Sequence, residues 1–100
     1  MTRLKRAYLD YNDRYWAGKL PDDLMVKWAY GIDAMGDSDP EIIRINALLR
    51  RWECAWRATL LHECAHIAVD LTGPELKDHG PKFKREIRRL LRAGAFDGLL

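Results

Sequence analysis

The residues from about Trp52 to Leu71 form the longest apolar segment of the chain, and they constrain the fold more than any other feature. Apolar side chains lie on nearly every side of this segment when it is drawn as a helix, and Gly73 and Pro74 then end it. A surface helix has one apolar stripe, whereas a helix that is apolar all round is surrounded by other elements. The sequence therefore predicts a buried central helix against which the rest of the chain packs.

Two further helices are predicted, one before and one after this segment. Between Thr2 and Trp16 the apolar residues recur at steps of three and four, and Gly18 follows as a natural end. Pro81 is suited to the first turn of a last helix, which we expect to run to about Arg92.

Two short segments between the first and the central helix have the composition of strands. Leu24–Tyr30 is a run of apolar and aromatic residues, and Glu41–Asn46 alternates between polar and apolar residues. The stretch 31–40 between them is rich in Gly, Asp, Ser and Pro, which is typical of a loop. We expect the two segments to pair as a small antiparallel sheet, so the predicted fold class is α+β.

Length and composition limit what such a chain can be. The 100 residues suffice for one core but not for two domains, so residues 1–100 are expected to form a single domain. The sequence contains neither an apolar signal core nor an apolar run of membrane length, which favours a cytoplasmic protein without a membrane partner. The net charge of +2 is too small to indicate nucleic-acid binding by itself.

The central helix carries one polar motif, His62-Glu63-Cys64-Ala65-His66, which matches H-E-x-x-H. Residues four apart lie about 40° apart around a helix and about 6 Å apart along it, so both imidazoles leave from one face. Two histidines and a glutamate inside an apolar helix are costly unless something binds them, and a metal ion does so. Glu63 lies beside the predicted metal rather than on it, where a general base for a metal-bound water would stand.

A catalytic zinc usually has three protein ligands and leaves the fourth position to water, so one more ligand is needed. Cys54 lies too far along the helix, and Cys64 points away from the metal face. The candidates after the helix are four: Asp70, Glu75, Asp78 and His79. We expect His79, the only remaining histidine, because the reversal at Gly73-Pro74 lets the chain return over the metal; Glu75 is the main alternative. One zinc ion per chain follows, since the three histidines form one set.

Motifs on both sides of this site resemble those of the SprT-like metallopeptidases, the family that includes the Spartan proteases. The resemblance covers about residues 8–92 and rests on Tyr11-Asn12, Gly18-Lys19-Leu20-Pro21, Ile45-Asn46, Thr59-Leu60-Leu61 before the H-E-x-x-H motif, and His79-Gly80-Pro81-Lys82-Phe83. It implies a small zincin-like α+β domain with His62, His66 and His79 as zinc ligands and Glu63 as the catalytic residue. It also implies a link to proteins crosslinked to DNA.

The predicted function is that of a zinc metallopeptidase, a hydrolase in which Glu63 takes a proton from zinc-bound water and passes it to the leaving amine. Its partner would be a protein or peptide substrate. For a second donor to the oxyanion, chain position allows Tyr30, Lys77 and Lys82. The alternative is a zinc-containing module that docks on nucleic acid or protein without significant turnover.

The last predicted helix has a strongly basic exposed side. Its basic residues surround an apolar stripe that contains Phe83 and Leu90. Such a side is typical both of a solvated helix face and of a surface that contacts phosphates, so DNA is a candidate partner. The candidate contacts are Lys84, Arg85, Arg88 and Arg89.

Overall fold

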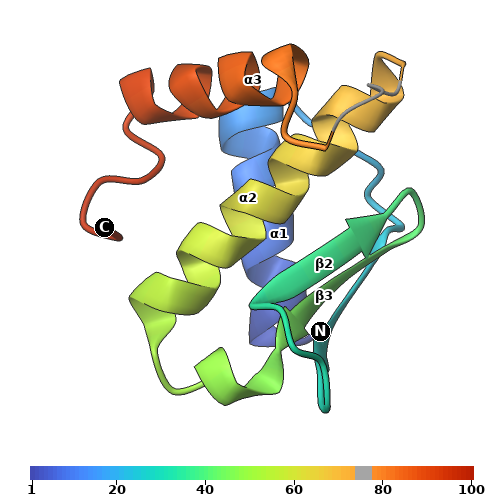
Figure 1. Ribbon diagram of the computed structural model, residues 1–100, viewed down its shortest axis with the longest axis vertical. Coiled ribbons are helices and arrows are strands. Elements are labelled where there is room, and N and C mark those ends of the chain that lie inside the picture. Colours follow the sequence, from blue (N-terminus) through green and yellow to red (C-terminus); the bar gives the residue numbers. More distant parts are fainter. Residues whose placement is uncertain (74–77) are drawn as a thin grey trace.

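The computed structural model describes residues 1–73 and 78–100 of the chain (Figure 1). In chain order the elements are α1 (Arg3–Trp16), β1 (Met25–Ala29), β2 (Gly36–Asp39), β3 (Ile42–Asn46), a short 3₁₀ turn (Ala47–Leu49), α2 (Glu53–Leu71) and α3 (Pro81–Arg92). The α+β class is confirmed, and the three predicted helices are present. Pro74, Glu75 and Lys77, which entered the predictions above, lie outside the described residues.

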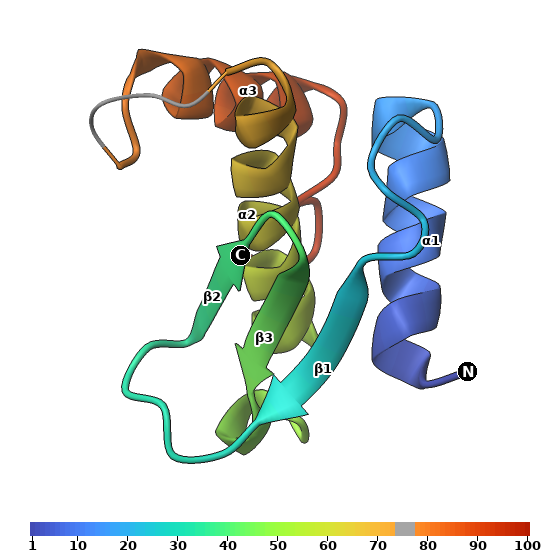
Figure 2. The same ribbon diagram turned by 90° about the vertical axis from the view of Figure 1, so that its right-hand side faces the viewer.

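Helix α2 is the centre of the molecule, as the apolar segment predicts. It contacts α1, α3, β2 and β3, and Figures 1 and 2 show these elements arranged around it. Trp56, Leu60 and Leu61 are almost fully buried, and so is Cys64. Burial of most of the middle of the helix explains why it has no continuous polar stripe.

The sheet differs from the predicted antiparallel pair. β1 and β3 are neighbours, but they run parallel, with Val26 opposite Ile43 and Trp28 opposite Ile45. The order is β1-β3-β2, because the chain first forms β2 at the far edge and then turns back into the middle (Figure 2). The prediction of a loop throughout 31–40 is therefore wrong for Gly36–Asp39, which pair antiparallel with β3. A parallel pair cannot be joined by a tight hairpin, and here β2 lies within the connection.

Two local features hold β2 in place. The Asp39 carboxylate accepts hydrogen bonds from the backbone N–H groups of Glu41 and Ile42, at 2.8 and 3.2 Å, and so closes the turn into β3. At the other end, a Cβ on Gly36 would lie 2.8 Å from Thr59 Cγ2 and 3.0 Å from the Arg44 carbonyl oxygen. Only glycine allows this strand to approach α2 so closely.

Asn46, at the end of β3, fixes the connection that leads from β1 to β2. Its side-chain amide donates to the carbonyls of Ile32 and Ala34, at 3.1 and 3.0 Å, and its Oδ1 accepts from Leu48 N–H at 3.0 Å. The Ile45-Asn46 motif therefore has a structural role: one buried amide orders the segment before β2 and the turn after β3.

Helix α1 begins where Thr2 accepts a hydrogen bond from Lys5 N–H at 3.0 Å, which is an N-cap. Asn12, in the second half of α1, forms two hydrogen bonds with the backbone of Leu20: its Nδ2 donates at 2.9 Å and its Oδ1 accepts at 3.0 Å. This pair holds the loop that leads into the sheet. No helix in the described part of the chain is long and apolar enough to cross a membrane.

Candidate metal centre

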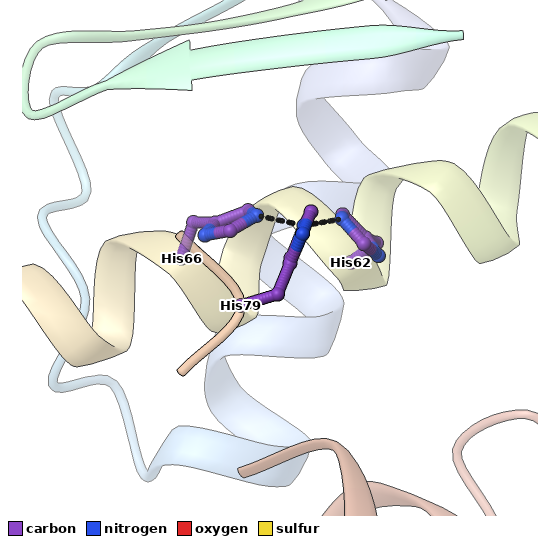
Figure 3. A group of neighbouring side chains, drawn as sticks. All are labelled: His62, His66 and His79. Carbon is purple, nitrogen blue, oxygen red and sulfur yellow. Dashed lines mark hydrogen bonds between the residues drawn. The ribbon is translucent and has the colours of Figure 1, made fainter. Parts of the chain in front are cut away.

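Three histidines from two segments converge on one point. His62 and His66 leave the same face of α2, and His79 reaches them from the connection before α3 (Figure 3). The Nε2 atom of His79 lies 3.1 Å from Nε2 of His62 and 3.1 Å from Nε2 of His66. Among the described residues, these three form a group whose ligand atoms all lie within 4.8 Å of one another.

This geometry fits a tetrahedral metal ion. Zinc–nitrogen bonds of about 2.0–2.1 Å place two ligand nitrogens roughly 3.3 Å apart, which is close to the separations seen here. Three imidazole nitrogens with no carboxylate among them are also a donor set that suits zinc. The three residues could therefore hold one metal ion and leave a fourth position open.

The protonation of the histidines favours cation binding. Burial, with smaller contributions from the neighbouring His66 and His79, lowers the pKa of His62 to about 4. Burial also lowers the pKa of His66, against the opposing effect of Asp78. Both rings are consequently neutral near pH 7, so each has a lone pair for a metal.

Phe83 supports all three rings from the first turn of α3. It stacks on His66 with ring centroids 4.3 Å apart, and its centroid lies 4.9 Å from that of His62 and 4.7 Å from that of His79. Gly80 is the N-cap of α3 and Pro81 follows it, so the helix begins directly after His79. The spacing between His79 and Phe83 thus places a candidate ligand and its packing partner at the same site.

The backbone of His79 is in the left-handed region, with φ of 56°. This conformation is uncommon for a residue with a side chain, although histidine adopts it more often than most. Strain of this kind persists where the surrounding structure fixes the residue, as the contacts with Phe83 and the other two histidines do here.

The other predicted ligand candidates lie farther out. Asp78 is exposed, and its two oxygens lie 3.7 Å from Nδ1 of His66 and of His79, at the outer side of these rings. Asp70 is exposed at the last turn of α2 and lines the cavity beside the histidines. Cys64 is buried in the core and Cys54 is exposed, where its thiol donates to the Gly98 carbonyl at 3.4 Å.

Glu63 is buried beside the histidines, with 5% of its surface exposed. Burial raises the pKa of its carboxyl to about 7, while a hydrogen bond from Ser38, at 2.8 Å from Oγ to Oε1, opposes the rise. A carboxyl poised near neutral pH suits proton transfer. Ser38 could not be predicted as a partner of Glu63, because the segment that carries it has the composition of a loop.

The four candidate DNA contacts on α3 are all exposed: Lys84, Arg85, Arg88 and Arg89. Arg89 also has partners within the protein: it pairs with Glu86 in α3, and its guanidinium lies 5.6 Å from the centre of the Trp16 ring. Two cavities open beside the histidines. Neither Tyr30 nor Lys82, which were predicted as possible hydrogen-bond donors to the oxyanion, is among the described residues that line them.

Fold and site together define a class of protein, an α+β domain whose central helix carries two members of a three-histidine candidate metal centre. The model of the SprT-like family matches residues 4–97, nearly the whole chain. The chain belongs to the SprT-like family, and the resemblance found in its motifs is confirmed. No curated protein matches the chain.

Proposed function

We propose that this protein is a zinc-dependent metallopeptidase, with His62, His66 and His79 as ligands of one zinc ion and Glu63 as the general base. The observation that carries the proposal is the position of Glu63, a buried carboxyl next to three converging histidines that do not need it as a ligand. A purely structural zinc site has no use for such a base and normally closes its fourth position with a protein ligand. Membership of the SprT-like family supports the same function.

The residues of the chain have separate roles in this reaction. Zinc, when bound, supplies a water of lowered pKa and an electrophile for the scissile carbonyl. Glu63 takes the proton of the attacking water on its carboxylate and returns it to the leaving amine. Ser38 donates to Oε1 and so fixes the rotamer of Glu63, which leaves Oε2 for the proton. Phe83 holds the three imidazoles in place by packing its ring against each of them.

Protein associated with DNA is the substrate class that we propose for this domain. Exposed basic residues of α3, among them Lys84, Arg85, Arg88 and Arg89, would contact phosphates without reading bases. Such contacts would concentrate the enzyme on DNA and bring crosslinked or bound protein to the candidate metal centre.

The alternative is a zinc-bearing module that binds nucleic acid or protein and does not turn over. Both functions need the three histidines, whereas only the peptidase needs Glu63 and an accessible cavity beside it. A cavity of about 480 Å³ does open on His62, Glu63, His66 and His79, which favours the peptidase.

The test is cleavage of unfolded proteins by the zinc-loaded protein. A panel of unfolded proteins is incubated with it, with and without single- and double-stranded DNA, and the fragments are separated on gels. We expect cleavage that stops when a chelator removes zinc and returns when zinc is added back. Intact substrates throughout, with one zinc ion bound per chain, would instead support the binding module.

A further inference from the structure

A second cavity, of about 520 Å³, adjoins the candidate metal centre on the side of α3. His62 and Glu63 form one end of it. The side walls come from three elements: Ala58 and Thr59 of α2, Ile87 and Leu91 of α3, and Phe96 of the segment that follows α3. Its volume falls within the range of about 300–1,000 Å³ that is usual for ligand pockets.

The two cavities at the histidines differ in chemistry. The cavity described above has carboxylates along its wall, from Asp37, Asp70 and Asp78. Among the described residues that line the cavity on the side of α3, His62 and Glu63 are the ones with ionisable side chains. Glu63 belongs to both, so a chain that crosses the proposed metal would place side chains on an acidic side and on an apolar side.

Exposed apolar side chains gather at the mouth of the second cavity. Met35, from the connection before β2, is 56% exposed, and Leu91 of α3 is 47% exposed. Exposing such side chains forfeits the free energy of burial, which a ligand that covers them restores. On α3 the exposed residues Arg88 and Arg92 flank Leu91, whereas Ile87, one turn earlier, lines the same cavity.

We propose that this cavity, between α2, α3 and the Met35 connection, binds a large apolar side chain of the substrate polypeptide, such as leucine, next to the bond that is cleaved. The proposal rests on the proposed peptidase function and adds a substrate preference to it. The occupant follows from the lining: apolar walls favour an aliphatic or aromatic side chain and disfavour a charged one, which would lose its hydration without gaining a partner. The bound side chain would lie next to the cleaved bond, because Glu63, the proposed general base, forms one end of the cavity.

The experiment uses three zinc-binding probes that differ in one side chain: the hydroxamates of N-acetyl-leucine, N-acetyl-alanine and N-acetyl-aspartate. Their hydroxamate group anchors each probe at zinc, and calorimetry on the zinc-loaded protein gives the dissociation constants. A well-fitted apolar pocket distinguishes ligands that differ by even one methylene about 10–200-fold. We therefore expect leucine hydroxamate to bind at least about tenfold more tightly than alanine hydroxamate, and aspartate hydroxamate to bind most weakly.

The variant L91E places a carboxylate at the mouth of the cavity and should abolish the preference for leucine. The matched control is L71E, because Leu71 is also an exposed leucine, 55% accessible, in the last turn of its helix, and it does not line this cavity. Both variants should retain zinc, since neither residue is one of the three candidate ligands. L71E should keep the preference.

Equal binding of leucine and alanine hydroxamates, a preference that survives in L91E, or no binding of any probe would overturn the proposal. Binding of the probes does not require turnover, so the two proposals can fail separately. A preference for leucine without cleavage of any protein would support the assignment of the cavity and refute the peptidase function. Cleavage of unfolded proteins with equal binding of all three probes would do the reverse.

Discussion

Asn12 should contribute more to the stability of this fold than any exposed polar residue. Its side chain supplies the hydrogen bonds that the backbone of the loop after α1 would otherwise lack. Asn12 is 3% exposed. Its side-chain NH₂ donates to the Leu20 carbonyl at 2.9 Å, and its side-chain oxygen accepts from Leu20 N–H at 3.0 Å. Its own carbonyl accepts from Gly18 N–H at 3.0 Å. Asn12→Ala keeps the helix but leaves the N–H and the C=O of Leu20 without partners.

The expected loss follows from these two groups. A buried donor or acceptor that loses its partner costs about 1–3 kcal/mol. Leu20 is itself 2% exposed, so water cannot replace either partner without opening the loop. Asn12→Ala should therefore lower the free energy of unfolding by about 2–6 kcal/mol. For a chain of this size that corresponds to a melting temperature lower by at least about 8 °C.

The assay is urea unfolding followed by circular dichroism, at one fixed free zinc concentration. A metal that binds only the folded state then adds the same stabilisation to each protein. The control is Asp13→Ala, an exposed neighbour on α1, which should change stability by less than about 0.5 kcal/mol. A loss below about 1 kcal/mol for Asn12→Ala, with an unchanged dependence on urea, would refute the reasoning, because it would mean that Leu20 is satisfied without Asn12.

Three further predictions concern the sheet, the metal and the basic helix. Gly36→Ala should destabilise the fold by about 1–3 kcal/mol in the same unfolding assay, because its Cβ would press on Thr59 and on a backbone carbonyl of β3; an unchanged midpoint would show that β2 can move aside. His79→Ala should weaken zinc binding more than 100-fold in a chelator competition, whereas Glu75→Ala should not, and the opposite pattern would make the third ligand a carboxylate. DNA binding should weaken steeply as the salt concentration rises. It should be lost when three exposed basic residues of α3 are changed to Glu, but not when three exposed basic residues of other elements are changed. Equal effects of the two sets would mean that α3 does not contact DNA specifically. The test set is Lys84, Arg85 and Arg88, and the control set is Arg6, Arg14 and Lys27.

The helices could be predicted from the sequence because their signals are local. The apolar segment gives α2 to within a residue, with Trp52 as its N-cap, and Pro81 begins α3 as expected. The direction of β1 could not be predicted, because it depends on which strand the chain forms between β1 and β3. Gly36–Asp39 contain no β-branched or aromatic residue, and their pairing is decided by β3 rather than by their own propensity.

The same distinction applies to the site. His62 and His66 share a helix face by spacing alone, and His79 was expected as the remaining histidine; the structure brings all three together. Ser38 could not be found in this way, because it reaches Glu63 only through the pairing of β2 and the close approach at Gly36. Contacts between elements far apart in the sequence carry no local pattern.

Glu63→Gln tests the peptidase most directly, because it keeps the size and polarity of the side chain and removes its ability to take a proton. Zinc content, thermal stability and cleavage of an unfolded protein are measured in parallel for the wild type and the variant. Zinc content and stability should be unchanged, since Glu63 is not needed as a ligand and a glutamine can still accept the hydrogen bond from Ser38. Cleavage should fall about 10²–10⁴-fold, the usual contribution of a positioned base. Equal cleavage by both proteins, each with one zinc ion bound, would contradict the assignment of Glu63 as the base.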